Sequence, residues 1–460
     1  MAEIHFAPVA ADCDTNVAAP ANDIHQMPAT FRMNRNLIYR MRLLVVILLS
    51  VASIAEPKQA HWVGSWATSQ QLAESGNAIP AADLKDVTLR QIVHLSIGGT
   101  ELRLRLSNRF GAIPVRFTAV HLARPFSPNS SRIDPASDIA LKFSGRPDVI
   151  IPAGADYLSD PITYPMRPSA DLAISFHLEE IPATQDGHLL SRATSYLVHG
   201  NHVSQTNFSE AREIEHWYYL AGVEVQASPG ALAVVALGDS ITDGRGSTTN
   251  ANNRWTDVLA HRLADSSSTK HIAVLNHGIG GNQLLGEGAG PNALARFDQD
   301  VLSQAGVRHL MILEGINDIG TLTKKEEQPP AEHDELVHRM IGAYEQLIMR
   351  AHTQGIKVTG CTILPFAGNR AYHPGANSEK DRQRVNDWIR TSGRFDFVVD
   401  FDQLVRDPKD PQHMLTKYDS GDHLHPSPEG YAVMGEAVPL SNFLQMTVLR
   451  SGNAQSTPRR

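Results

Sequence analysis

The feature that most constrains the fold of this chain is a change in hydrophobic periodicity near residue 230. Before this point apolar and polar residues alternate, as in Leu102–Leu106 and Leu172–Leu178, with glycines, prolines and asparagines between such runs. Alternation with a period of two is typical of strands that bury one face. We therefore predict an all-β, antiparallel sandwich-like domain over residues 56–226, without amphipathic helices.

Beyond residue 230, short continuous apolar runs alternate with helical patterns. The runs are Ala231–Leu237, Ile272–Leu275, Leu310–Leu313, Val358–Leu364 and Phe397–Val399. Between them, apolar residues recur at helical spacing over 255–263 and 336–351. Buried strands that alternate with helices specify a parallel sheet covered on both faces. We predict a flavodoxin-like, doubly wound α/β domain over residues 227–448, with its ligand site at the carboxyl ends of the strands.

Residues 1–55 have the pattern of a leader, and residues 449–460 that of a polar tail. Arginines precede the apolar run Leu43–Ala52, and a small-x-small triplet ends at Ala55. This order is that of a secretory signal peptide, which we place at about 33–55. An uncleaved membrane anchor is the alternative, although the apolar run is about half of the ~20 residues that span a bilayer. The expected mature chain is secreted or periplasmic.

Charge and cysteine content narrow the possible partners. A net charge of −8 over 460 residues gives no electrostatic reason to expect nucleic acid or an anionic membrane surface. Cys13 would leave with the leader, so the mature chain would keep Cys361 alone and form no internal disulfide. Because Cys361 lies in an apolar run, we expect a buried thiol rather than a reactive one.

Two strand ends carry residues suited to nucleophilic catalysis. The first strand runs directly into Gly238–Ser240, and a serine at a strand-to-helix turn exposes its hydroxyl and its own N–H. After the last strand come Asp422 and His425, whose spacing lets one short loop place a carboxylate against Nδ1 and leave Nε2 for the serine. Ser427 and Pro428 then begin a helix. A capping serine and a merely polar loop are the structural alternatives.

Two further strand ends carry donors suited to a developing oxyanion. Gly280 follows the second strand in a glycine-rich turn, and Gln283 stands where a dinucleotide fingerprint requires its third glycine. Asn317 follows the third strand, and an Asn amide can donate to negative charge in a transition state. A plain glycine turn and an Asx turn are the alternatives. A metal site would use Asp419, Asp422, His423 and His425, but their spacing matches no zinc pattern.

Taken together, these motifs resemble the four blocks of the GDSL, or SGNH, hydrolases. The matching segments are Gly238-Asp239-Ser240, Gly280, Gly315-x-Asn317-Asp318 and Asp422-x-x-His425-Pro426. Trp62–Thr68 and Leu89–Asn108 are similar to the β-domain of secreted two-domain bacterial members. The G-x-S-x-G elbow of the α/β-hydrolases is absent, because Thr242 occupies its last position.

The resemblance implies roles for these residues. Ser240 would be the nucleophile, His425 the general base and Asp422 its partner. The backbone N–H groups of Ser240 and Gly280, with the Asn317 side chain, would form the oxyanion hole. Neither a metal nor an organic cofactor is implied.

The expected function is ester hydrolysis through an acyl-enzyme, on a small-molecule or polysaccharide ester. Deacetylation of carbohydrate is the first hypothesis, and a lysophospholipase or general short-chain esterase is the alternative. A non-catalytic carbohydrate-binding protein is the alternative of another class. Trp62 and Trp66 would then be candidate glycan contacts, although core packing is the commoner role. Thr321–Glu335 is predicted to be a surface loop that could border the substrate entrance.

Overall fold

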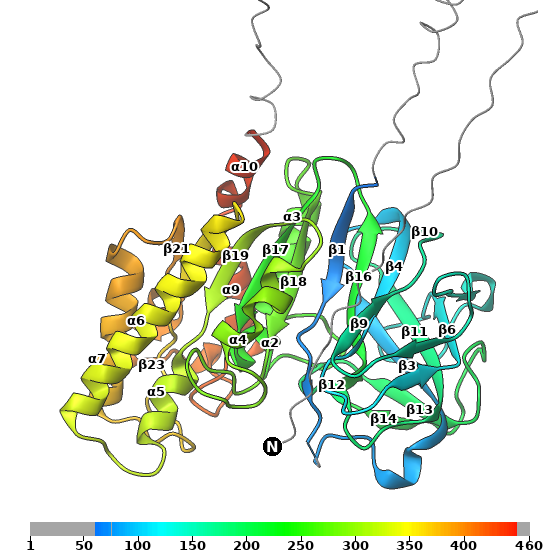
Figure 1. Cartoon of the computed structure of the whole chain (residues 1–460). Coiled ribbons are helices and arrows are strands. Elements are labelled where there is room, and N and C mark those ends of the chain that lie inside the picture. The colour runs from blue at the N-terminus through cyan, green and yellow to red at the C-terminus, as the bar shows by residue number, and fades with distance from the viewer. Residues whose placement is uncertain (1–59, 75, 449–460) are drawn as a thin grey trace, which may run out of the picture. The chain divides into compact units, whose positions relative to one another are not determined.

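The computed structural model describes residues 60–74 and 76–448 (Figure 1). The predicted leader at 1–55, with its signal peptide, and the tail at 449–460 lie outside the described residues. From Ala60 onward the chain forms one compact unit. Within the described ranges, no helix combines the length and apolarity needed to cross a membrane.

The first region of this unit is built from antiparallel strands, as predicted. Its three larger sheets have the orders β1-β16-β4-β10 with β9 beside β4, β14-β13-β3-β11-β6-β7, and β15-β12-β2. The strands are β1 (Trp62–Ala67), β2 (Gln71–Leu72), β3 (Lys85–His94), β4 (Gly99–Asn108), β5 (Val115–Phe117), β6 (Ala119–Ala123), β7 (Ile139–Ala140), β8 (Val149–Ile151), β9 (Ala155–Leu158), β10 (Ile162–Met166), β11 (Asp171–Glu180), β12 (Asp186–His188), β13 (Ser195–His199), β14 (Arg212–Ile214), β15 (Trp217–Tyr218) and β16 (Leu220–Gln226).

The period-two pattern corresponds to the burial of these strands. On β4 the three leucines of the 102–106 segment are fully buried. The two arginines between them, Arg103 and Arg105, both reach Glu224 of β16 at 2.6 Å. Each leucine therefore enters the core, while the intervening charges pair across strands on the other face.

The second region is a five-stranded parallel sheet with the order β18-β17-β19-β20-β21 (Figure 1). This order is the flavodoxin-like one predicted from the alternation of apolar runs and helices. The strands are β17 (Leu232–Gly238), β18 (Ile272–Gly278), β19 (Val307–Leu313), β20 (Lys357–Cys361) and β21 (Phe397–Val399). The helices are α2 (Ser240–Asp243), α3 (Trp255–Asp265), α4 (Ala293–Phe297), α5 (Ile316–Thr323), α6 (Pro330–Thr353), α7 (Ala376–Thr391), α8 (Phe401–Val405), α9 (Pro428–Ala437) and α10 (Ser441–Val448).

One predicted loop is shorter than expected. Thr321–Glu335 was expected to be irregular, but α5 continues to Thr323 and α6 begins at Pro330. A proline in the first turn favours a helix start, because its fixed φ suits the helix and the N–H that it lacks has no partner there. The irregular connection is therefore limited to residues 324–329.

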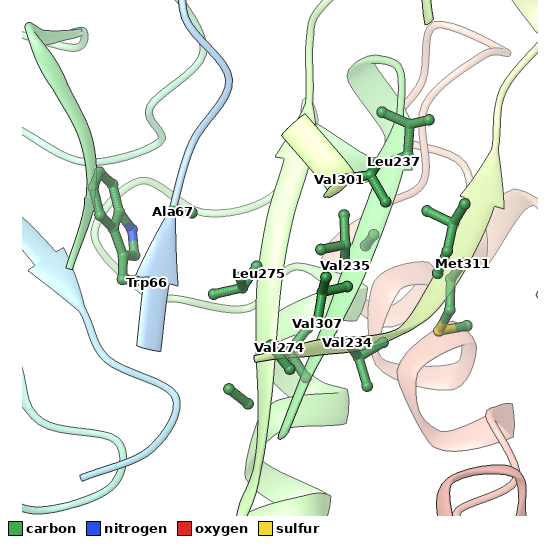
Figure 2. Close-up of a cluster of buried hydrophobic side chains, with 14 of the residues drawn as sticks. Trp66, Ala67, Val234, Val235, Leu237, Val274, Leu275, Val301, Val307 and Met311 are labelled. Atoms are coloured by element: carbon green, nitrogen blue, oxygen red, sulfur yellow. The ribbon is translucent and has the colours of Figure 1, made fainter. Parts of the chain in front are cut away.

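The two regions share one hydrophobic cluster (Figure 2). Strand β1 pairs with β16 of the antiparallel region and also packs against β18 of the parallel sheet. Gly64 favours this close approach, because a Cβ atom there would lie 2.8 Å from Leu275 Cδ1 of β18 and that side chain would have to move. Trp66 is buried and meets the Trp217 ring edge-on at 5.0 Å. Trp66 is thus a core residue, whereas Trp62 is only partly buried and lies under the Arg103 guanidinium.

The thiol of Cys361 is buried at the end of β20, as predicted. Burial raises its pKa well above the usual value. A thiol that holds its proton so tightly is a packing group rather than a nucleophile.

Candidate active site

Ser240 lies just beyond the carboxyl end of β17, which pairs with β18 on one side and with β19 on the other in the parallel sheet. Strand β17 ends at Gly238, and the Asp239 carboxylate caps the next helix by accepting the Ile241 N–H at 2.8 Å. Ser240 is the first residue of α2, so its own N–H has no acceptor within the helix. A side chain at Gly238 would collide with Leu313 O of β19, which is why the turn is so tight.

His425 and Asp422 lie next to this serine, as their spacing predicts. The Ser240 hydroxyl is 2.8 Å from His425 Nε2, and His425 Nδ1 is 2.6 Å from Asp422 Oδ2. Burial would raise the pKa of Asp422, but its hydrogen bonds with the ring and backbone of His425 hold that pKa well below its usual range. Ser427 caps α9 by accepting the Gly430 N–H at 3.1 Å, so the loop that carries both residues has a defined end. The three side chains form a serine–histidine–aspartate chain.

The Gly280 N–H does not face Ser240. It donates to Asp243 Oδ2 at 3.0 Å, so the predicted oxyanion donor already has a partner. The next residue, Gly281, lines the hollow beside Ser240 with a positive φ of 77°. Within the described part of the chain, no acceptor is found for the Gly281 N–H. The two adjacent glycines therefore have different roles. Gly280 fixes the turn through its hydrogen bond to Asp243, and the backbone of Gly281 lines the hollow.

The Asn317 side chain is held in one orientation at the start of α5. Its Nδ2 donates to Asn282 O at 2.7 Å, and its Oδ1 accepts from the Tyr372 hydroxyl at 2.7 Å. An amide nitrogen carries two hydrogens, so one remains for a ligand in the hollow. Tyr372 was not predicted from the sequence, because it lies in an irregular segment without a motif.

Ser240, Gly281, Asn317 and His425 line one open hollow of about 470 Å³. Its walls are mostly polar, and Leu424, Ala371 and the Tyr372 ring supply the apolar side-chain surface. A hollow of this composition offers little area for a long acyl chain.

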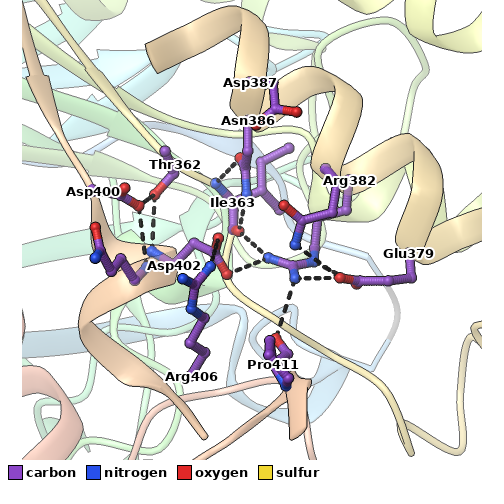
Figure 3. A network of polar contacts seen from close by, with 12 residues as sticks. Thr362, Ile363, Glu379, Arg382, Asn386, Asp387, Asp400, Asp402, Arg406 and Pro411 are labelled. Atoms are coloured by element: carbon purple, nitrogen blue, oxygen red, sulfur yellow. Dashed lines mark hydrogen bonds and ion pairs between the residues drawn. The ribbon is translucent and has the colours of Figure 1, made fainter. Parts of the chain in front are cut away.

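The segment after β20 is anchored by a buried polar network (Figure 3). Asn386 of α7 exchanges two hydrogen bonds with the Ile363 backbone, at 2.7 and 2.9 Å. Arg382, fully buried, donates to Ile363 O at 2.9 Å and to Asp402 at 2.7 Å. These contacts fix the start of the segment that carries Tyr372 to the hollow.

Arg296 of α4 contacts the ends of neighbouring strands of the parallel sheet. It was not predicted from the sequence as a site residue. Its guanidinium donates to Gly238 O at 2.9 Å and to His277 O at 2.7 Å, and its Nε donates to the Asn282 side chain at 2.9 Å. It also lies 3.5 Å from Glu314. Arg296 is therefore a single buried cation that ties the ends of β17, β18 and β19 together.

Besides Asp300, which pairs with Arg296 at 2.9 Å, three buried carboxyl groups near the strand ends have raised pKa values. Burial raises the pKa of Asp239 to about 7, and the neighbouring Asp318 adds to the shift. Burial also raises the pKa of Asp318 to about 6, against hydrogen bonds from the Leu284 and Leu285 N–H groups. The pKa of Glu314 is raised well above its usual value, by burial first and by the neighbouring Asp239 second. Because burial disfavours the charged form, these acids hold protons at pH values at which exposed acids release them.

The antiparallel region contributes His188 to the back of the site. His188 Nε2 is 2.8 Å from Asp243 Oδ1, and its Nδ1 is 2.9 Å from Ser69 O. Both nitrogens face acceptors, so both donate when the ring is protonated. The same Asp243 carboxylate accepts the Gly280 N–H, and Asp243 ends the helix that begins at Ser240. His188 therefore contacts the last residue of the helix that begins at Ser240, and it is linked to the Gly280–Gly281 turn through Asp243.

The residues of the metal hypothesis form two separate pairs. His423 Nδ1 is 2.7 Å from Asp419 Oδ2, and His425 binds Asp422. In the part of the chain that the structure covers, no three His, Cys, Asp or Glu side chains gather as metal ligands would.

Residues 236–433 match the GDSL-like lipase/acylhydrolase family. The match spans all four motif segments and confirms their resemblance to this family. A comparison with curated protein sequences gives no match.

Similar solved structures include three from bacteria. A GDSL-like lipase from Bacteroides thetaiotaomicron is 20% identical over 46% of this chain and 88% of its own, with a TM-score of 0.34. A carbohydrate acetylesterase from Sinorhizobium meliloti is 17% identical over 48% of this chain and 99% of its own, with a TM-score of 0.33. An aryl esterase from M. smegmatis is 15% identical over 48% and 99%, with a TM-score of 0.35. The family assignment rests on the match at 236–433 and not on these likenesses.

Proposed function

We propose that this protein is a serine esterase that hydrolyses short-chain carboxylic esters through an acyl-enzyme. The observation that supports this most strongly is the chain of hydrogen bonds from Ser240 through His425 to Asp422, at 2.8 and 2.6 Å. It opens onto a hollow large enough for a small ester. The shortage of apolar surface in that hollow favours an acetyl or similarly short acyl group.

In the proposed first step, Ser240 Oγ attacks the acyl carbon while His425 Nε2 takes its proton. Asp422 orients the ring and stabilises the imidazolium. The N–H groups of Ser240 and Gly281 and the remaining Asn317 amide hydrogen hold the oxyanion, with Gly281 taking the role first predicted for Gly280. The alcohol leaves with the proton from His425, and water then releases the acid by the same route.

The finer proposal is deacetylation of carbohydrate by a secreted enzyme. It draws on the predicted signal peptide and on the polar walls of the hollow. A lysophospholipase would require a surface for a longer acyl chain, and the lining of this hollow offers less support for it.

The test uses the chain from Glu56 with p-nitrophenyl esters from acetate to decanoate and with acetylated xylan. Ser240→Ala should lower kcat by about 10⁶-fold, because the other groups of such a triad act only through the nucleophile. Ser247→Ala is the matched control, because its buried hydroxyl has no hydrogen-bond partner among the described residues.

A rate that falls from acetate to decanoate supports the short-chain proposal, and a maximum at decanoate contradicts it. Wild type and Ser240→Ala that are equally inactive while folded would overturn the esterase proposal. Glycan binding by such an inactive protein would then favour the non-catalytic alternative. N-terminal mass analysis of the exported chain tests secretion, with cleavage expected near Ala55.

A further inference from the structure

Three cationic side chains surround the hollow that contains Ser240. Arg245, Lys324 and Arg370 all contribute to its walls, and all three are exposed. Within the described residues, none of these side chains forms an ion pair or a hydrogen bond. Many other arginines of the molecule do have carboxylate partners, as Arg382 does with Asp402 and Arg390 with Asp400.

No free carboxylate balances these cations inside the hollow. Asp422 is the acidic residue of its lining, and Asp422 is bound to His425 at 2.6 Å. The chain as a whole carries a net charge of −8. A local excess of positive charge around one hollow therefore runs against the charge of the whole molecule, and it attracts anions to this place.

The cations come from the same three segments as the groups around the reacting ester. Arg245 follows α2, which begins at Ser240, and Lys324 caps the end of α5, which carries Asn317. Arg370 is two residues from Tyr372, whose hydroxyl holds the Asn317 amide. An anionic group on the substrate would meet these cations while its ester lies at Ser240.

We propose that the preferred substrate is a short-chain ester whose molecule also carries a negative charge, such as a carboxylate, sulfate or phosphate. An O-acetylated acidic saccharide has this chemistry, and so does a short half-ester of a dicarboxylic acid. The inference rests on the proposed esterase function and adds the charge of the substrate to it. Arginine binds such groups through two parallel N–H donors, and lysine binds them as a point charge.

The experiment compares esters that differ in charge alone. In the first pair, potassium 4-acetoxybenzoate carries a negative charge on the alcohol part of the substrate, and 4-acetoxybenzamide is neutral at the same position. Mono-p-nitrophenyl glutarate and p-nitrophenyl valerate do the same for the acyl part. Each kcat/KM is divided by the rate of alkaline hydrolysis of the same ester, which removes differences in intrinsic reactivity.

For at least one pair, we expect the normalised kcat/KM of the anionic ester to exceed that of the neutral ester about tenfold at low salt. The ratio should fall toward one at 0.5 M NaCl, because exposed charges are screened within about 4 Å there. Lys324→Gln, Arg245→Gln and Arg370→Gln should each lower the ratio, and the triple variant should remove the preference. Lys325→Gln is the matched control: it removes an exposed cation next to Lys324 that does not line the hollow.

The pair that shows the preference tells whether the charge belongs to the alcohol or to the acyl part. Ratios near one for both pairs, unaffected by salt and by the three variants, would overturn the inference while the neutral esters are still hydrolysed. A ratio that falls equally in Lys325→Gln would also overturn it, because the effect would then be one of overall charge. Loss of all hydrolysis, with wild type equal to Ser240→Ala, would instead remove the esterase proposal itself.

Discussion

Two of the clusters that combine a serine, a histidine and an aspartate in this molecule lie beside the parallel sheet and can be compared. The strand-end cluster is Ser240, His425 and Asp422, which opens onto the hollow. The buried cluster is Ser69, His277 and Asp300, where Ser69 of the antiparallel region meets β18 and the turn that follows α4. The residue types are the same, yet only one arrangement suits catalysis.

The difference lies in where the serine proton goes. In the buried cluster the Ser69 hydroxyl donates to Asp300 at 2.7 Å and receives a hydrogen bond from Arg296 at 3.0 Å. Its histidine cannot take that proton, because burial lowers the pKa of His277 to about 4. In the strand-end cluster the serine faces a histidine nitrogen, and the carboxylate lies on the far side of the ring. The comparison teaches that hydrogen-bond order and access decide the role of such a cluster.

The largest effect should follow from Asp422→Asn. Loss of the carboxylate leaves the Ser240–His425 geometry in place but removes the group that orients and stabilises the imidazolium, so kcat should fall about 10⁴-fold. The midpoint of thermal unfolding should change by only a few degrees, since Asp422 is partly exposed. Ester hydrolysis and calorimetry on the same preparation check both halves. A loss of less than tenfold in kcat would remove Asp422 from the proposed mechanism.

Asp300→Asn should instead have its main effect on stability. It removes the charge that pairs with Arg296 at 2.9 Å in a buried site, and breaking such a pair costs about 3–5 kcal/mol in the free energy of unfolding. Denaturant unfolding measures this loss. Asp298→Asn is the control, because its pair with Arg350 is exposed. Equal stability of the two variants would contradict the structural role of the buried cluster.

His188→Asn tests whether the antiparallel region positions the site. Without the His188 contact, Asp243 should hold the Gly280–Gly281 turn less firmly, and kcat should fall about tenfold or more with little change in KM. His188→Gln, which keeps a longer donor, should recover part of the loss. The control is His121→Asn, which breaks a His–Asp pair at 3.1 Å within the antiparallel region. A kcat equal to that of wild type would mean that His188 contributes only to packing.

The last prediction concerns the pH dependence of stability. Asp239 has a pKa near 7 in the folded chain and about 3.9 when unfolded, so the folded state holds a proton that the unfolded state releases between these values. Stability from this group is therefore present below pH 4, declines as pH rises toward 7, and stays lost above it. Asp239→Asn removes this titration, so its midpoint of unfolding relative to wild type should rise from pH 4 to pH 8. Asp265→Asn, at an exposed position, should show no such trend, and a flat difference for Asp239→Asn would contradict the assignment.

Much of the site could be predicted because its signals are local. Ser240 closely follows β17, and Asp422 and His425 share one short loop before α9. A parallel sheet brings the carboxyl ends of its strands to one edge, where such residues can meet. The sequence pointed to Gly280, whereas the neighbouring Gly281 lines the hollow. Two adjacent glycines cannot be distinguished in a sequence until the acceptor of each N–H is known. The roles of Tyr372 and Arg296 in the site could not be predicted from the sequence. Each acts through contacts with residues 14 to 58 positions away, and no short motif marks such contacts.

By itself, the sequence determined the two architectures and named the serine, the histidine and the aspartate of the candidate site. Periodicity and short-range spacing can be read directly from the sequence. The backbone geometry of strands and helices then determines which residues share a face or an edge. Only the tertiary structure decided which of the two glycine N–H groups lacks an acceptor among the described residues, and which of the two compared clusters opens onto a hollow. It also decided that His188 of the antiparallel region contacts Asp243, which holds the Gly280–Gly281 turn. Those outcomes depend on donors and acceptors that meet across long sequence separations, and their pairing is settled only when folding brings them together and excludes water.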